Sequence, residues 1–193
     1  MDLNAQFRGA RQFGTVCKPR NSSVTSDRYS QFQNVTYDPP YVMIAANWIP
    51  GKLRKDTCRN ITETGEFVWN MATYDLREAV NKTAADVKGD EFEFAGLTKE
   101  PSKLVKPWRV KESPIQFECV LYTSLHLPGA SILGNVDLII ARVIGIHIAS
   151  WALNEDGMID LPKIRPIARC GYYQYTVIER VRNPFTIVRC MTG

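Results

Sequence analysis

The sequence predicts a mostly β protein with a few short helices, folded as an antiparallel barrel. About seven segments have the residue pattern of β-strands, and they follow one another without the regular strand–helix alternation that parallel sheets require. The chain also contains no G-x-G-x-x-G motif, which argues further against a doubly wound parallel sheet. With 193 residues, 45% of them apolar, it can bury a core without disulfides or metals, so we expect one domain over residues 1–193.

The predicted strands are of two kinds. Residues 41–48 and 136–149 are nearly all apolar, as expected of strands covered on both faces, and Gly145 in the second is a candidate bulge. Residues 67–71 and 115–127 alternate with the period of a strand instead, and we expect the longer one to be a half-exposed antiparallel strand. Shorter strands are expected at residues 13–17, 172–179 and 185–191.

Helical signals are few and short. They cover residues 56–64, residues 74–82 and a turn near residues 161–164. The first is expected to end at Gly65, because glycine adopts the left-handed conformation that often terminates a helix. The polar segment from 83 to 112 has few strand signals and is expected to form a long surface excursion.

Composition excludes several classes of protein. The five cysteines lie far apart and include no C-x-x-C pair, which predicts neither a disulfide framework nor a zinc site. There is no signal-peptide pattern near residue 1 and no apolar run of membrane-helix length, so we expect a soluble, cytoplasmic protein. The net charge of +4 suits a phosphate-bearing ligand but falls short of a dedicated nucleic-acid binder.

The polar residues do not form a recognisable set of catalytic side chains. His147 lies in the most apolar predicted strand, where a hydrogen-bonded core histidine is the expected role. His126 is the only other histidine, so no histidine-rich metal site is expected. Spacing alone places no pair among Glu91, Glu93 and Glu118 in an acid/base arrangement, and no G-x-S-x-G motif appears.

A basic loop before the first predicted helix is the clearest candidate for a ligand site. The loop and the first helical turn carry four cationic residues: Lys52, Arg54, Lys55 and Arg59. Asp56 or Thr57 can cap the helix, whose first N–H groups and positive dipole end suit a phosphomonoester. The alternative is an ordinary solvated charge cluster beside a capped helix.

Motifs that carry a family resemblance run in order from about residue 11 to residue 175. The first is Tyr29-Ser30-Gln31-Phe32-Gln33-Asn34 followed by Tyr37-Asp38-Pro39-Pro40-Tyr41-Val42. Then come Lys55-Asp56-Thr57, Arg59-Asn60-Ile61, Thr64-Gly65-Glu66-Phe67-Val68-Trp69-Asn70, Ala95-Gly96-Leu97-Thr98, Glu118-Cys119, Ile159-Asp160-Leu161 and Arg165-Pro166. In this order they resemble the flavin reductase-like family.

The resemblance implies a six-stranded Greek-key FMN-binding split barrel. It also implies a homodimer with FMN near the subunit interface, and NAD(P)H:flavin oxidoreductase activity that can supply a monooxygenase partner. NADH or NADPH is then the electron donor, and hydride passes from the nicotinamide to flavin N5. Because the cofactor performs this chemistry, no side chain is expected to act as acid or base.

The resemblance also assigns site residues by position. The FMN phosphate is expected against Lys55, Thr57 and Arg59, in a segment that includes Asp56. Tyr29, Ser30, Gln31 and Phe32 are expected to border the isoalloxazine together with Asn47. Tyr175 and the turn from Arg169 to Gly171 are expected to close the site, with the second subunit as one source of these residues.

Three departures from the family pattern leave alternatives open. They are Ala10-Arg11-Gln12, Asp27-Arg28 and Gly171-Tyr172. The charges of Asp27 and Arg28 can tune the flavin potential, bind a substrate carboxylate or pair with each other at the surface. A non-catalytic FMN-binding or electron-carrying protein is therefore the alternative function. A third hypothesis, a nucleic-acid-binding barrel, draws on the basic loop and on Tyr172, Tyr173 and Tyr175.

Overall fold

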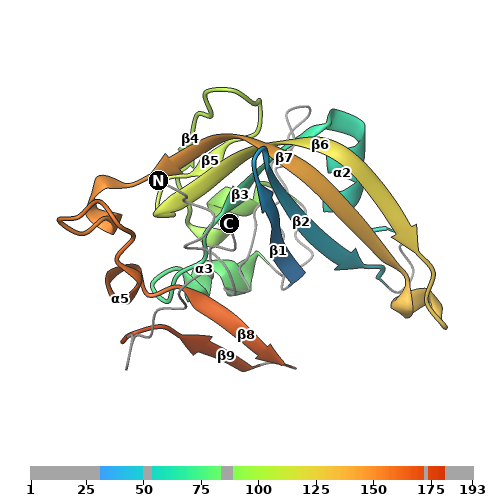
Figure 1. Ribbon diagram of the computed structural model, residues 1–193. Helices are drawn as coiled ribbons and strands as arrows, with labels where there is room; N and C mark the ends of the chain where they lie inside the picture. The colour runs from blue at the N-terminus through green and yellow to red at the C-terminus, as the bar shows by residue number, and fades with distance from the viewer. Residues whose placement is uncertain (1–30, 50–53, 84–88, 172–173, 181–193) are drawn as a thin grey trace, which may run out of the picture.

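The structure is a computed structural model that describes residues 31–49, 54–83, 89–171 and 174–180 (Figure 1). Its main feature is a five-stranded sheet in which every neighbouring pair is antiparallel. The strand order is β1 (Gln31–Tyr37), β2 (Pro40–Asn47), β7 (Val136–Ile148), β6 (Ile115–Leu127) and β3 (Glu66–Asn70). The predicted β-dominated antiparallel class is therefore confirmed.

Smaller elements surround this sheet. Two short hairpins pair β4 (Lys99–Glu100) with β5 (Arg109–Val110) and β8 (Ile167–Gly171) with β9 (Gln174–Val177). The helices are α2 (Asp56–Thr64), α3 (Arg77–Lys82), α4 (Glu91–Ala95) and α5 (Leu161–Ile164), with 3₁₀ turns η1 (Ile132–Gly134) and η2 (Ser150–Ala152). In the described part of the chain, no helix is long and apolar enough to cross a membrane.

Several element bounds agree with the sequence patterns. The β6 strand covers 115–127, and β7 is the central strand, as predicted. The α2 helix ends at Gly65, which has φ of 73° and donates its N–H to the Ile61 carbonyl. In contrast, β8 was not predicted, and α3 begins only at Arg77, after a turn in which the N–H groups of Leu76 and Arg77 bond to the carbonyls three residues earlier. The predicted strands at 13–17 and 185–191 lie outside the described residues.

The prediction that β6 would bury one face along its whole length was wrong. Residues 115–119 are buried on both faces, whereas residues 122–127 are exposed on both. The register shifts twice along the β6–β7 pair, and the first shift leaves Ile144 unpaired beside Gly145, the predicted bulge. A bulge adds twist and bends a long strand, so the two halves of β6 meet different surroundings.

The predicted coverage of β2 and β3 is also corrected by the structure. Only alternate residues of β2 are buried, so one of its faces contributes most to the core. The same holds for residues 136–143 of β7, which was also predicted to be covered on both faces. In β3 the residues between the core-facing positions, Val68 and Asn70, are buried too. The polar segment from 83 to 112 includes α4, β4 and β5, with a small cluster of Phe92 and Val110, instead of an unstructured excursion.

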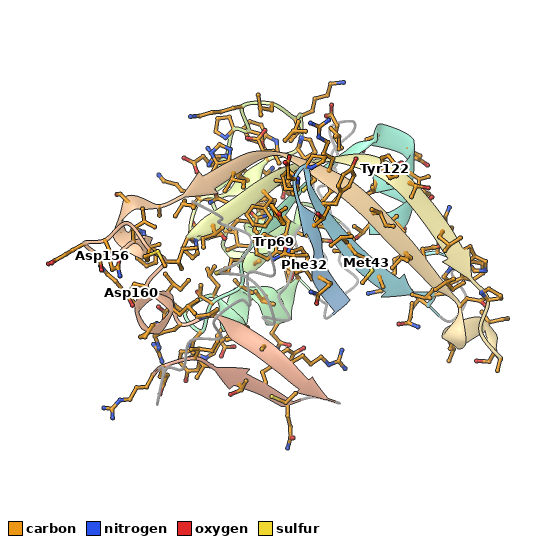
Figure 2. All side chains as sticks on the ribbon, viewed as in Figure 1. Phe32, Met43, Trp69, Tyr122, Asp156 and Asp160 are labelled. Carbon is orange, nitrogen blue, oxygen red and sulfur yellow. The ribbon has the colours of Figure 1, made fainter. Side chains whose placement is uncertain are left out.

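Three stacked aromatic rings lie in the middle of the main core. Trp69 on β3 stacks on Phe32 of β1 and on Phe117 of β6, with ring centroids 4.7 Å apart in both pairs. Phe32 and Trp69 are labelled in Figure 2. The inward-facing residues Cys58 and Ile61 of α2 join the same core. The helix is thus fixed against the sheet by apolar contacts before any charge is considered.

His147 has the role expected of a core histidine. Its Nε2 lies 2.5 Å from Oε1 of Glu118, whose side chain is 0% exposed. The Glu118 carboxylate also accepts the backbone N–H groups of Lys103 at 2.9 Å, Leu104 at 2.6 Å and Val105 at 2.9 Å. A Cβ at Gly145, directly opposite Glu118, would lie 3.0 Å from Leu104, so glycine leaves room for this loop.

These hydrogen bonds determine the titration of Glu118. Burial raises the pKa of Glu118, whereas the three backbone N–H donors and His147 lower it. The lowering is the larger effect, so the pKa of Glu118 lies below its usual value. A lowered pKa in the folded state gives stability above the pKa of the unfolded chain, about 4.3. That stability is lost as pH falls through the folded-state pKa.

We therefore expect Glu118→Gln to lower the free energy of unfolding at pH 7 by about 3 kcal/mol, because the amide leaves buried N–H donors unsatisfied. The difference from the wild type should narrow below about pH 4 as Glu118 becomes protonated. Urea denaturation at both pH values measures it, with the exposed Glu155→Gln as the matched control. A difference that is equally large in acid would contradict this role for the charge.

Candidate functional site

The N-terminus of α2 differs from the sequence prediction in its cap. The N-cap residue is Lys55, with φ of −62° and ψ of 144°, whereas Asp56 is the first helical residue. Neither Asp56 nor Thr57 caps the helix as expected, and the Lys55 side chain makes no capping hydrogen bond. The first-turn N–H groups of a helix lie at the positive end of its dipole, where an anion is stabilised. The backbone here therefore suits a phosphate.

The predicted phosphate residues lie within one turn of this helix end. Arg59 is 53% exposed, and its guanidinium lies 2.9 Å from Asp56 and 3.9 Å from Glu63. Such exposed pairs along a helix contribute little to stability, so an anion can replace Asp56 as the partner of Arg59 at low cost. Lys55 is half-buried and Thr57 is buried, so Thr57 faces the protein more than the solvent.

A partly buried ion pair lies just before α2, and the sequence analysis missed it. Arg54 donates from Nε to Oδ2 of Asp137 at 2.8 Å, and Trp48 donates from Nε1 to the same oxygen at 3.2 Å. The hydrogen bond to Asp137 raises the pKa of Arg54, although burial lowers it. His126 Nδ1 lies 3.4 Å from Oδ1, within ion-pair distance but not aligned as a hydrogen bond.

The sequence contained half of the signal for this pair. Asp137 interrupts an apolar β-strand run, which marks a charge that needs a partner once it is buried. Arg54 is 83 residues away along the chain, so spacing could not identify it as that partner.

The residues expected near the isoalloxazine are only partly described. Tyr29 and Ser30 lie outside the described residues, as does the side chain of Gln31, whose backbone begins β1. The Phe32 ring is buried against Trp69, so it belongs to the core. Asn47 is exposed at the end of β2, one residue beyond Ala46, which pairs with Asp137. Asn47 and the loop before α2 thus adjoin the same end of the sheet.

The residues expected to close the site lie on a different part of the chain. Arg169 and Tyr175 face each other in the β8–β9 pair, and Gly171 pairs with Gln174. In Figure 1 this hairpin lies at the lower left, well apart from α2 at the upper right. A single chain does not bring these two groups of predicted residues together. Tyr172, Tyr173, Asp27 and Arg28 lie outside the described residues.

Comparison with known proteins agrees with this architecture. Residues 25–163 match the flavin reductase-like domain. The uncharacterized protein YwrF of Bacillus subtilis is 31% identical over 170 residues, which cover 86% of this chain and 81% of YwrF.

Two solved structures are similar over nearly the whole chain. Component B of nitrilotriacetate monooxygenase from Bacillus cereus has a TM-score of 0.80 and 30% identity, covering 96% of this chain and 91% of that one. A protein with a split barrel domain from Shewanella frigidimarina has a TM-score of 0.76 at 23% identity, covering 94% and 89%, and at this identity shows the fold alone. With the domain match spanning most of the sequence and the split-barrel fold shared, the chain belongs to the flavin reductase-like domain family.

Proposed function

We propose that this protein binds FMN and transfers hydride from NADH or NADPH to flavin. Family membership supports a flavin cofactor and an oxidoreductase. The observation that carries the choice of FMN is the helix end at Lys55, where backbone donors and the cations Lys55 and Arg59 gather within one turn. A phosphate is the part of FMN that distinguishes it from riboflavin, and this donor set suits a phosphate.

The residues of this chain divide the binding of FMN between two regions. The side chains of Lys55 and Arg59 hold the phosphate at the start of α2, and Thr57 contributes its backbone N–H because its side chain is buried. The segment from Tyr29 to Phe32 and Asn47 border the ring, with Phe32 contributing its backbone because its side chain is in the core. When bound, FMN supplies the hydride acceptor at N5, so the protein supplies orientation and electrostatics and needs no side-chain acid or base.

A homodimer completes the proposed site. The outer half of β6 and η1 carry exposed apolar residues, namely Tyr122, Leu125, Leu127, Ile132 and Leu133. In Figure 1 the end of the β6–β7 pair that carries η1 extends beyond the rest of the sheet, whereas Tyr122, labelled in Figure 2, lies nearer the middle of β6, where its ring packs edge-on against Tyr41. Exposed apolar residues gathered on one extension are typical of an interface, and a second copy of the chain fits it. The partner's hairpin corresponding to β8–β9 then closes the flavin site.

A monooxygenase is the proposed recipient of reduced flavin. This step rests on the similarity to component B of nitrilotriacetate monooxygenase from Bacillus cereus. The alternative function is a non-catalytic FMN carrier, which the departures at Asp27-Arg28 and Gly171-Tyr172 favour.

The flavin and its donor are tested together by absorbance spectroscopy. We expect the purified protein, reconstituted with FMN, to retain the visible flavin bands after gel filtration and to bleach on anaerobic titration with NADH or NADPH. Free FMN with the same nucleotides is the control for uncatalysed reduction. Protein that takes up no FMN would contradict the proposal. Bound flavin that bleaches no faster than free FMN would favour the alternative function, a non-catalytic FMN carrier.

The position of the phosphate is tested by charge reversal. We expect Lys55→Glu with Arg59→Glu to weaken FMN binding roughly a hundredfold, since two attractive charges become repulsive, and to change riboflavin binding little. Fluorescence titration measures both ligands. Lys111→Glu with Lys163→Glu changes the net charge equally on other elements and serves as the control. Equal FMN affinity in the two double variants would mean that the phosphate lies elsewhere.

A further inference from the structure

Asp137 is a charged residue in a position that the fold otherwise gives to apolar side chains. The core-facing stripe of β7 consists of Asp137, Ile139, Ala141 and Val143, all buried. The Asp137 side chain is only 1% exposed. Burying a carboxylate costs several kcal/mol unless hydrogen bonds and an opposite charge compensate. A charge at this position therefore indicates a role beyond filling the core.

Among the described residues, the two hydrogen-bond donors to Asp137 lie at either end of the segment between β2 and α2. Trp48 follows β2 directly, and Arg54 immediately precedes the N-cap Lys55. His126 lies on the neighbouring strand β6, directly opposite Asp137, and its ring packs against Trp48 with centroids 4.9 Å apart. The carboxylate thus connects both ends of the loop between β2 and α2 to the central strand.

Arg54 is bonded in a way that leaves it suited to a second anion. Its contact with Asp137 runs through Nε, which is one of the five N–H donors of a guanidinium. The Arg54 side chain is 38% exposed, whereas Asp137 is almost fully buried, so the pair extends from the core to the surface. A guanidinium fixed on one edge can present its other edge with little further loss of side-chain entropy.

We propose that Asp137 is a positioning residue of the FMN site, which holds Arg54 through Nε so that its outer edge binds the flavin phosphate beside Lys55. This inference rests on the proposed phosphate site at α2. Arg54 thus joins Lys55 and Arg59 as a phosphate ligand. Asp137 does not contact the cofactor and acts only by holding Arg54.

Neutralising Asp137 would change the FMN affinity in opposite directions in its two possible roles. If Asp137 only added negative charge near the phosphate, its neutralisation would strengthen FMN binding by removing a repulsion. If Asp137 positions Arg54, neutralisation weakens FMN binding because the guanidinium loses its fixed orientation. Asn is close in size and keeps an acceptor for Trp48, so Asp137→Asn tests the charge with the least change in packing.

We expect Asp137→Asn to raise the dissociation constant for FMN about fivefold and to leave that for riboflavin within about twofold. Arg54→Lys keeps the net charge but lacks the forked donors, and it should also weaken FMN binding several-fold. The Asp137→Asn/Arg54→Lys double variant should bind FMN about as well as the weaker single variant, because both act through one contact. Fluorescence titration of the full-length protein, stripped of flavin, measures both ligands.

The outcomes separate this inference from the proposed function. If the wild type binds riboflavin as tightly as FMN, the proposed phosphate site itself is contradicted. A wild type that prefers FMN, with the same preference in Asp137→Asn or a stronger one, would overturn only the role of Asp137. If Asp137→Asn does not fold, Arg54→Lys tests the role of Asp137 instead, since a change at the partly exposed Arg54 disturbs the core less. Unchanged FMN affinity in Arg54→Lys would mean that only the charge at position 54 matters, and it would overturn the positioning role. Arg77→Lys, an exposed arginine on α3, is the matched control.

Discussion

The central strand β7 is hydrogen-bonded to β6 on one side and to β2 on the other, and the rest of the described structure depends on this pairing. Its core-facing residues meet the stacked rings of Phe32, Trp69 and Phe117 and the inner face of α2. Because antiparallel register determines which residues are opposite one another, the pairing also sets where each polar side chain enters the core.

Two buried carboxylates at opposite ends of the β6–β7 pair form hydrogen bonds to neighbouring loops and so hold these loops against the sheet. Glu118, opposite Gly145, binds His147 and three successive backbone N–H groups of the loop at 103–105. Asp137, opposite His126, binds Arg54 and Trp48 at the loop that leads into α2. A loop has few apolar side chains to bury, so a satisfied charge in the sheet is an effective anchor for it.

Local patterns predicted the parts of this fold that depend on neighbouring residues. The bounds of β6 and α2, the left-handed Gly65 and the bulge beside Gly145 all follow from short-range sequence. Two features could not be predicted from short-range sequence: that β6 is buried in its first half and exposed in its second, and that Arg54 is the partner of Asp137. Both depend on which distant segment lies against the strand. In the candidate site, sequence and resemblance pointed to the turn from Lys55 to Arg59, but not to the ion pair that orients the residue before it.

A flavin carries the reactive atom of a hydride transfer, so the protein contributes mainly through position. In the proposed function, the geometry of the charges near α2 therefore matters more than their number. Arg59 lies on an exposed helix surface with Asp56 as a weak partner, and it can turn toward an anion. Arg54 is instead fixed from the core by Asp137, so it can set the distance and direction of approach. A phosphate held by one fixed and one adaptable cation would be located by the sheet itself, and the ring would then lie where β1 begins and β2 ends. Because α2 and the β8–β9 hairpin are separated within one chain, the proposed site takes the hairpin from a second subunit.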